Sequence, residues 1–97
     1  MIFIDTETTG LLNPSANDLK NQPEIIEFYG IKLDDEFQII GDVNHLIKPS
    51  SPISEEITKI TGITNEMLEG KPSFPQVFDE IYDLFFDDDH VIAHNCY

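Results

Sequence analysis

The stretch that decides the fold is FIDTETTG, residues 3–10, at the end of an apolar run that begins at Met1. An uninterrupted apolar run predicts a strand that is covered on both faces, as is typical of a central strand in a sheet. Asp5 and Glu7 follow at once, and ionised carboxylates at the end of a buried strand are costly unless positive charge compensates them. The sequence therefore raises the question of what supplies that charge.

The composition is that of one small, acidic domain. The 97 residues are 40% hydrophobic and carry 19 acidic residues against five lysines and no arginine, a net charge of −14. This excess argues against a basic surface that wraps a phosphate backbone, so contact with nucleic acid would run through metal ions or through another segment.

The single cysteine, Cys96, excludes an internal disulfide and a multi-cysteine zinc site. No apolar run reaches the roughly 20 residues that cross a bilayer, which predicts a cytoplasmic chain without membrane contact.

Three strands are predicted in the first half. Residues 1–5 form the first, and residues 24–33 (EIIEFYGIKL) and 37–48 (FQIIGDVNHLIK) form the others, joined by a turn at residues 34–36. Gly41 is a predicted bulge site, and the turn formers of residues 13–18 predict an exposed loop. Together these strands predict an antiparallel meander.

Helices follow the meander. Ser54 is expected to cap a short helix that Gly62 ends, with Ile53, Ile57 and Ile60 on one face. Thr64 is expected to cap a single turn that Gly70 ends. Ser73 and Gln76 fit a capping box before a longer helix. The apolar face of that helix is predicted to hold Phe74, Val77, Phe78, Ile81 and Phe85.

A last strand begins at residues 90–93. After a right-handed helical connection it is expected to lie parallel to the first strand. The fold class is therefore α/β: a mixed sheet with a three-strand antiparallel meander, helices, and then a strand parallel to the first. Because the carboxyl ends of parallel strands meet at one edge, Asp5 and Glu7 are expected near His94 and Asn95.

The two acids are suited to holding a cation. Residues two apart on a strand point to the same face, about 6 to 7 Å apart. Oxygen ligands favour hard ions such as Mg²⁺ or Mn²⁺, and two such ions about 4 Å apart can activate a water and stabilise the leaving oxygen of a phosphodiester. Metal ions would then supply the charge that the protein lacks. Two solvated acids at an exposed strand end are the alternative reading.

The residues resemble a known family along essentially the whole chain. The first stretch resembles the first motif of the DEDD exonucleases, proofreading-type 3′–5′ nucleases of ribonuclease H-like fold. Residues 24–33, 46–81 and 91–95 (VIAHN) look like the second strand, the third strand with its helix and TGIT loop, and the start of the second motif. The resemblance is greatest to bacterial polymerase III epsilon-type proofreading exonucleases, including versions embedded in larger polymerases.

That resemblance implies roles for particular residues. Asp5 and Glu7 would be the first two metal-binding, catalytic acids of a two-metal Mg²⁺ or Mn²⁺ site. The implied substrate-binding residues are Thr8 and Thr9 near the 3′-terminal nucleotide, Ile60 and Thr61 in a loop that wedges against the terminal base, and His94 and Asn95 beside the scissile bond. The implied substrate is a single-stranded 3′ end of DNA, with RNA open, and the implied partner is a polymerase subunit or a fused polymerase.

The resemblance also implies that residues 1–97 are only the amino-terminal portion of one exonuclease domain. The family's third and fourth metal acids and its general base would lie beyond Tyr97, so we expect this truncated chain to be inactive by itself. We also expect uncovered apolar faces at Phe74, Phe78 and Phe85 and some self-association. A catalytically dead binding or interaction module is the alternative function.

Overall fold

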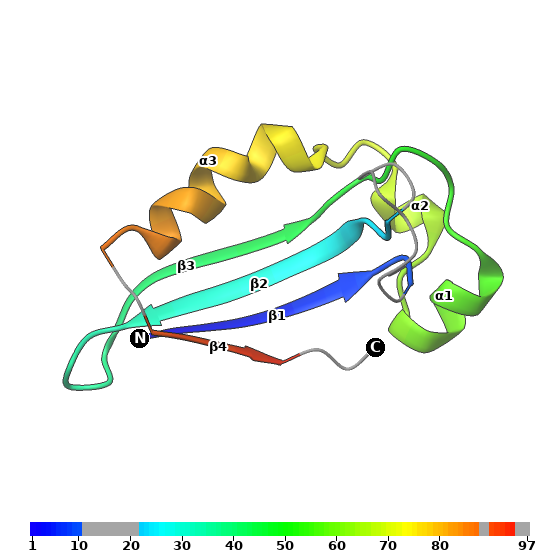
Figure 1. Ribbon diagram of the computed structural model, residues 1–97. Helices are drawn as coiled ribbons and strands as arrows, with labels where there is room; N and C mark the ends of the chain where they lie inside the picture. Colours follow the sequence, from blue (N-terminus) through cyan, green and yellow to red (C-terminus); the bar gives the residue numbers. More distant parts are fainter. Residues whose placement is uncertain (11–21, 88–89, 95–97) are drawn as a thin grey trace.

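Strand β1 (Ile2–Thr8) lies inside the sheet, between two other strands. It pairs antiparallel with β2 (Ile25–Leu33) and parallel with β4 (Val91–His94), while β3 (Ile39–Leu46) pairs with the outer edge of β2. The structure is a computed structural model that describes residues 1–10, 22–87 and 90–94 (Figure 1). The predicted α/β fold, with its meander and parallel last strand, is confirmed. The predicted loop at 13–18 and the residues Asn95 and Cys96 lie outside the described residues.

β1 is longer than predicted, because it runs on to Thr8 instead of ending at Asp5. Its ladder with β2 continues past both acids, pairing Asp5 with Tyr29 and Glu7 with Glu27. The sequence prediction ended the strand at Asp5 because it relied on a run of apolar residues. Pairing between strands uses backbone N–H and C=O groups, so polar side chains do not end it. The two acids therefore lie within the sheet rather than in a loop that follows it.

A β-bulge redirects one core residue. The β1–β2 pairing shifts between Glu7↔Glu27 and Thr8↔Ile25, so that Ile26 is an extra residue on β2. Ile26 is fully buried, and it packs with residues of the short helices instead of with the rest of β2. The bulge thus joins the sheet to the helical end of the molecule.

The second bulge lies where one was predicted. The β2–β3 pairing shifts between Lys32↔Gly41 and Leu33↔Ile39, which leaves Ile40 as the extra residue beside Gly41. Ile39 and Ile40 are 65% and 58% exposed.

β3 begins later than predicted because Phe37 belongs to the turn. Phe37 has a φ of 61°, in the left-handed region. The carboxylate of Asp34 holds this turn by accepting hydrogen bonds from the backbone N–H of Glu36 and of Gln38, at 2.8 and 2.9 Å. Strand β3 therefore starts at Ile39, two residues after the predicted position.

The first helix, α1 (Glu55–Thr61), has the predicted ends. The Ser54 hydroxyl accepts a hydrogen bond from the Ile57 N–H at 3.2 Å. Gly62 takes a left-handed conformation with φ 78°, and its N–H donates to the Thr58 carbonyl at 2.8 Å. Local side-chain chemistry therefore sets both ends of α1.

The second helix, α2 (Asn65–Leu68), begins as predicted and ends one residue early. The Thr64 hydroxyl accepts a hydrogen bond from the Met67 N–H at 3.1 Å. Glu69, and not Gly70, is the residue that ends the helix. None of the described helices is long and apolar enough to span a membrane.

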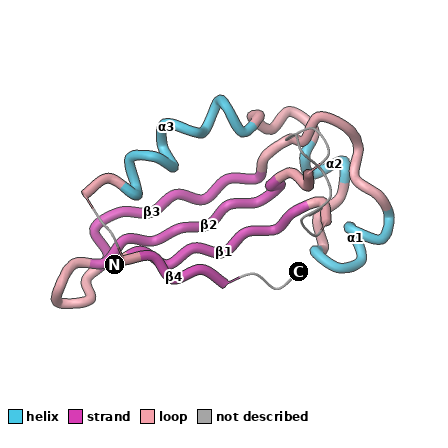
Figure 2. The backbone as a smooth tube through the Cα atoms, in the orientation of Figure 1, coloured by secondary structure: helices cyan, strands magenta, loops and turns pink. Residues whose placement is uncertain are grey.

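Helix α3 (Phe74–Phe85) lies along one face of β2 and β3 (Figures 1 and 2). The predicted capping box is present, since the Gln76 side chain accepts a hydrogen bond from the Ser73 N–H at 2.8 Å. Phe78, on the predicted apolar face, is 48% exposed, as expected for an uncovered part of that face, and the prediction omitted Leu84, which is buried. The buried residues of this helix are Val77, Ile81 and Leu84.

Two hydrophobic cores hold the described residues together. The buried members of the core under α3 are Ile2, Phe28, Ile47, Val77, Ile81 and Leu84. Those of the core around α1 and α2 are Ile26, Ile53, Ile57, Ile63 and Leu68. Ile60, predicted on the same face of α1 as Ile53 and Ile57, is 53% exposed, whereas Ile63, beyond Gly62, is buried in that core.

The contact between Gly30 and α3 gives a stability prediction. A Cβ atom on Gly30 would lie 2.6 Å from Leu84 Cδ2 and 3.0 Å from a ring carbon of Phe28. We expect Gly30→Ala to lower the free energy of unfolding by about 1 to 3 kcal/mol through overpacking, measured by urea denaturation. Because Leu84→Ala removes the clash, the double variant should lose less than the sum of the two single losses. If the two single losses simply add in the double variant, the contact between residue 30 and Leu84 is not what makes Gly30→Ala destabilising.

Candidate functional site

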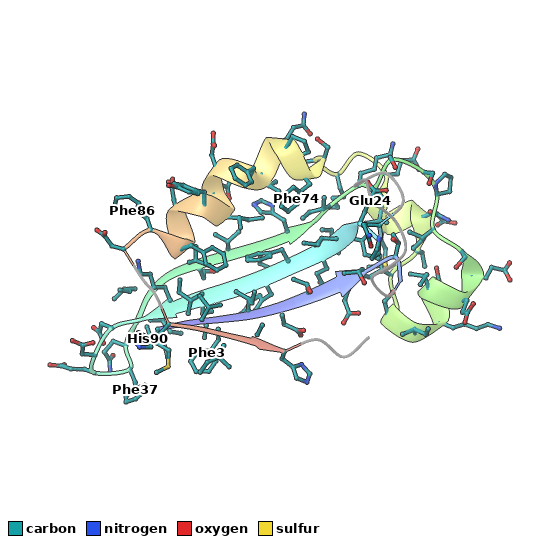
Figure 3. The ribbon with its side chains drawn as sticks, viewed as in Figure 1. Phe3, Glu24, Phe37, Phe74, Phe86 and His90 are labelled. Carbon is teal, nitrogen blue, oxygen red and sulfur yellow. The ribbon has the colours of Figure 1, made fainter. Side chains whose placement is uncertain are left out.

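Asp5 and Glu7 lie on the face of the sheet opposite α3. Ile2 and Ile4, which alternate with them on β1, pack into the core under that helix. Figure 3 shows Phe3, which shares the face of the two acids, on the other side of the sheet from α3. The structure thus places the two predicted metal-binding acids together on one face.

The neighbouring strands add further polar groups to this face. β2 places Tyr29 opposite Asp5 and Glu27 opposite Glu7. β4 places His94 beside Asp5, with 3.7 Å between His94 Nδ1 and Asp5 Oδ1. The predicted proximity of His94 to the acids is therefore present, whereas Asn95 lies outside the described residues.

Asp5 presents a buried oxygen without a donor. Its Oδ1 atom is inaccessible to solvent and has no hydrogen-bond partner among the described residues, although the side chain as a whole is 48% exposed. The His94 nitrogen at 3.7 Å is beyond hydrogen-bonding distance. A desolvated carboxylate oxygen without a donor destabilises the fold unless a cation approaches it. This oxygen is therefore suited to ligating a hard cation.

The environment of Glu7 also favours a cation. Burial raises the pKa of the Glu7 carboxyl above its usual value, and the negative charges of Asp5 and then Glu27 raise it further. The His94 side chain opposes this shift and lowers the pKa. A divalent ion between Asp5 and Glu7 would reverse the repulsion that raises the Glu7 pKa.

Thr8 and Thr9 hold the end of β1 in place. The Thr8 hydroxyl donates a hydrogen bond to the Gly10 carbonyl at 2.7 Å. Thr9 pairs with Glu24 twice: its hydroxyl accepts from the Glu24 N–H at 2.9 Å, and its own N–H donates to the Glu24 carbonyl at 3.0 Å. The hydroxyls that were predicted to face a nucleotide therefore each make one local hydrogen bond, the Thr8 hydroxyl as donor and the Thr9 hydroxyl as acceptor.

Ile60 and Thr61 end α1, which lies beyond the carboxyl end of β1 (Figure 1). The Thr61 hydroxyl donates to the Ile57 carbonyl at 2.8 Å and accepts from the Ile63 N–H at 3.1 Å. Thr61 therefore fixes the turn into the loop, while Ile60 presents an exposed apolar side chain.

Sequence reasoning missed Glu27. Its position opposite Glu7 depends on the register of two strands that a long segment separates, and no local pattern sets that register. Among the described residues, no three His, Cys, Asp or Glu side chains gather closely enough to hold a metal ion. Within this part of the chain, Asp5 and Glu7 could thus supply two of the ligands of a metal site, but the described residues do not complete it.

The pKa of Glu7 gives a pH-dependent prediction. Because the folded-state pKa is raised, ionised Glu7 destabilises the metal-free protein above that pKa, and protonation relieves the cost as the pH falls through it. We expect Glu7→Gln to raise the melting temperature in EDTA near pH ~7, with the gain shrinking toward pH ~4.5. Glu69→Gln, an exposed acid at the end of α2, is the matched control. Equal effects of the two changes at every pH would contradict this account of Glu7.

Thr9 gives a prediction that separates its structural role from ligand binding. Thr9→Val leaves the Glu24 N–H without its acceptor, whereas Thr9→Ser keeps a hydroxyl at that position. We expect Thr9→Val to cost about 1 kcal/mol of stability and Thr9→Ser much less, as measured by chemical denaturation in EDTA. Identical stabilities of the two variants would show that the hydrogen bond between Thr9 and Glu24 contributes nothing.

Sequence comparisons relate the chain to nucleases and polymerases. The family model of the exonucleases (RNase_T) matches residues 2–97. The PolC-type DNA polymerase III of Thermotoga maritima is 42% identical over 94 residues, which are 97% of this chain and 6% of the polymerase. An exonuclease of Escherichia phage 186 is 40% identical over 96 residues, 99% of this chain and 43% of the phage protein. The chain thus spans less than half of the length of these relatives.

Comparison of structures agrees with the sequence comparisons. Exonuclease X, solved in complex with 5′ overhanging duplex DNA, superposes with a TM-score of 0.68 at 28% identity, over 96% of this chain and 47% of that chain. The nuclease domain of 3′hExo, a DEDDh family member, superposes with a TM-score of 0.62 at 19% identity, over 97% of this chain and 50% of that chain, and shares the fold. The resemblance to the DEDD exonucleases is confirmed, and the chain belongs to the exonuclease family.

Proposed function

We propose that residues 1–97 form the amino-terminal part of a metal-dependent 3′–5′ exonuclease domain that removes nucleotides from the 3′ end of DNA. The observation that carries this proposal is the Asp5 oxygen that is buried and without a hydrogen-bond partner among the described residues, beside Glu7 on one face of the sheet. Two neighbouring carboxylates with a buried oxygen destabilise a fold that binds no cation, whereas a cation-dependent enzyme uses them as ligands.

In this proposal Asp5 and Glu7 hold divalent metal, Mg²⁺ or Mn²⁺, with their carboxylate oxygens. When bound, two such ions would activate a water and stabilise the leaving oxygen of the phosphodiester. His94, close to Asp5, orients the scissile phosphate together with Asn95. The two further acids and the general base that this mechanism needs are not among residues 1–97, so we expect the 97-residue chain to be inactive by itself.

The substrate-binding residues lie around the end of β1. The backbone at Thr8 and Thr9, fixed by the pairing of Thr9 with Glu24, receives the terminal nucleotide. Ile60 supplies an exposed apolar side chain for contact with the terminal base, and Thr61 fixes its loop. Each of these residues therefore binds or positions the strand rather than reacting with it.

Relatives support DNA as the substrate and a polymerase as the partner. Several are DNA polymerases of the PolC type, and Exonuclease X was solved with duplex DNA. A fused or associated polymerase would deliver the strand and supply the basic contacts that this acidic chain lacks. We therefore place the protein in proofreading or related DNA metabolism, in the cytoplasm.

The test compares the 97-residue chain with a version extended through the following motifs, on a 5′-labelled single strand with Mn²⁺ or with EDTA. We expect shortening from the 3′ end only by the extended version with metal, and Asp5→Ala should slow it by at least roughly 100-fold. Asp42→Ala, an exposed acid on β3, is the matched control. A folded but inert extended version would instead support a non-catalytic binding module.

A further inference from the structure

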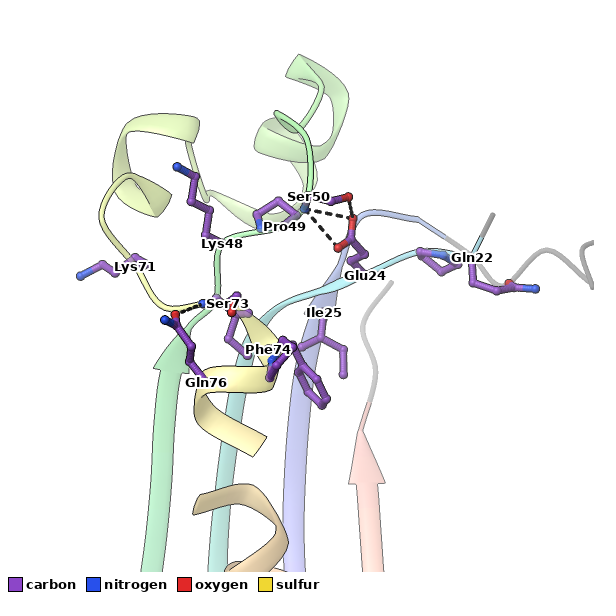
Figure 4. A pocket seen from close by; sticks show the side chains of 13 residues that line it. Gln22, Glu24, Ile25, Lys48, Pro49, Ser50, Lys71, Ser73, Phe74 and Gln76 are labelled. Carbon is purple, nitrogen blue, oxygen red and sulfur yellow. Dashed lines mark hydrogen bonds between the residues drawn. The ribbon is translucent and has the colours of Figure 1, made fainter. Parts of the chain in front are cut away.

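Two acids, Glu24 and Glu27, lie around the start of β2, and their surroundings differ. The Glu24 carboxylate accepts hydrogen bonds from the Ser50 N–H at 3.1 Å and from the Ser50 hydroxyl at 2.7 Å (Figure 4). Glu27 is half-buried, yet among the residues that the structure describes its carboxylate has no hydrogen-bond or ion-pair partner. Glu24 therefore joins the start of β2 to the segment after β3, whereas Glu27 needs another explanation.

The sheet holds Glu27 directly beside Glu7. The two residues pair across β1 and β2, and on its other side Glu27 pairs with Leu46 of β3. Phe28, the next residue of β2, packs in the core under α3, and Glu27 therefore points to the opposite face, which carries Glu7. Residues directly opposite each other in antiparallel strands have Cβ atoms about 4.5 to 5.5 Å apart. Glu27 is thus a direct neighbour of a proposed metal ligand.

Glu27 adds a third negative charge to the face that carries Asp5 and Glu7. Burial and the charge of Asp5 raise the pKa of the Glu7 carboxyl, and the charge of Glu27 raises it further. In the described part of the chain, no lysine forms an ion pair with any of the three acids. The described His, Cys, Asp and Glu side chains also form no group of three that could ligate one metal ion. Glu27 therefore acts on Glu7 by its charge without being a third ligand beside it.

We propose that Glu27 is a positioning residue of the metal site, an inference that rests on the proposed function: its carboxylate accepts hydrogen bonds from the water that a divalent ion at Asp5 and Glu7 retains. Mg²⁺ gives up its water reluctantly and keeps several molecules when few protein side chains ligate it. Residues that hydrogen-bond to the ligands of a metal orient them and raise the affinity of the site. An ionised carboxylate forms the stronger, charge-assisted kind of hydrogen bond. Glu27 offers such an acceptor one strand away from Glu7.

A titration of Mn²⁺ followed by electron paramagnetic resonance tests this role on the version extended through the following motifs. We expect Glu27→Gln, which keeps the size of the side chain, to weaken Mn²⁺ binding by roughly tenfold. Glu27→Asp keeps the charge but moves the carboxylate back by one methylene group, so it should weaken binding as well. Asp42→Asn removes one negative charge from β3 and should leave binding unchanged. Binding that Glu27→Gln leaves unchanged, or that Glu27→Asp retains in full, would overturn the assignment.

Thermal unfolding of the same variants in EDTA distinguishes positioning from support of the fold. Because Glu27→Gln removes a charge directly opposite Glu7, we expect it to raise the melting temperature of the metal-free protein while it weakens metal binding. A lower melting temperature together with weaker binding would show that Glu27 acts only through the fold, and would overturn the assignment. If the unchanged extended version binds no Mn²⁺, the proposed function fails and the role of Glu27 fails with it. If Asp5→Asn weakens binding and Glu27→Gln does not, only the role of Glu27 is contradicted.

Discussion

The repulsion between two carboxylates on one strand is the constraint on which the rest of this structure depends. Asp5 has a solvent-inaccessible oxygen that accepts no hydrogen bond from the residues the structure describes, and Glu7 has a raised pKa because burial and its acidic neighbours disfavour its charge. In the part of the chain that the structure describes, no lysine forms an ion pair with either carboxylate. The protein therefore holds an arrangement that is unfavourable by itself and that, in the proposed function, a bound divalent cation would make favourable.

The fold maintains that arrangement by fixing the end of β1 from several directions. β2 and β4 flank the strand, and the pairing of Thr9 with Glu24 closes its last residues onto the start of β2. The bulge at Ile26 then ties this end to the core around α1 and α2. The two carboxylates, which repel each other, thus lie on a strand that hydrogen bonds hold in place, and this backbone keeps them from moving apart.

Local chemistry made much of the fold predictable from the sequence. Ser54, Thr64 and Ser73 each mark a helix start, and Gly62 marks a helix end, because caps depend on residues only a few positions away. Asp5 and Glu7 were predictable as a pair because strand alternation is equally local. What local patterns did not show depends on tertiary packing: Leu84 is buried although the predicted face of α3 omitted it, and Ile60 is exposed although Ile57, on the same predicted face, is buried.

The position of Glu27 opposite Glu7 could not be predicted from the sequence, because it too depends on tertiary structure. Residues 9–24 separate the two strands, so only the folded register brings the acids together. The partnership of Glu24 with both Thr9 and Ser50 likewise joins three segments that no periodic pattern connects. Sequence therefore indicated which residues carry the chemistry, and the structure was needed to show which groups act on them.

The central claim is that divalent metal compensates the charge of Asp5 and Glu7, and a titration of Mn²⁺ followed by electron paramagnetic resonance tests it most directly. The account predicts that the version extended through the following motifs binds Mn²⁺ and that Asp5→Asn or Glu7→Gln weakens the binding by at least roughly tenfold. Asp42→Asn, on another strand, should leave it unchanged. Mn²⁺ binding of equal strength in all four proteins would contradict the account and leave the paired carboxylates without an explanation.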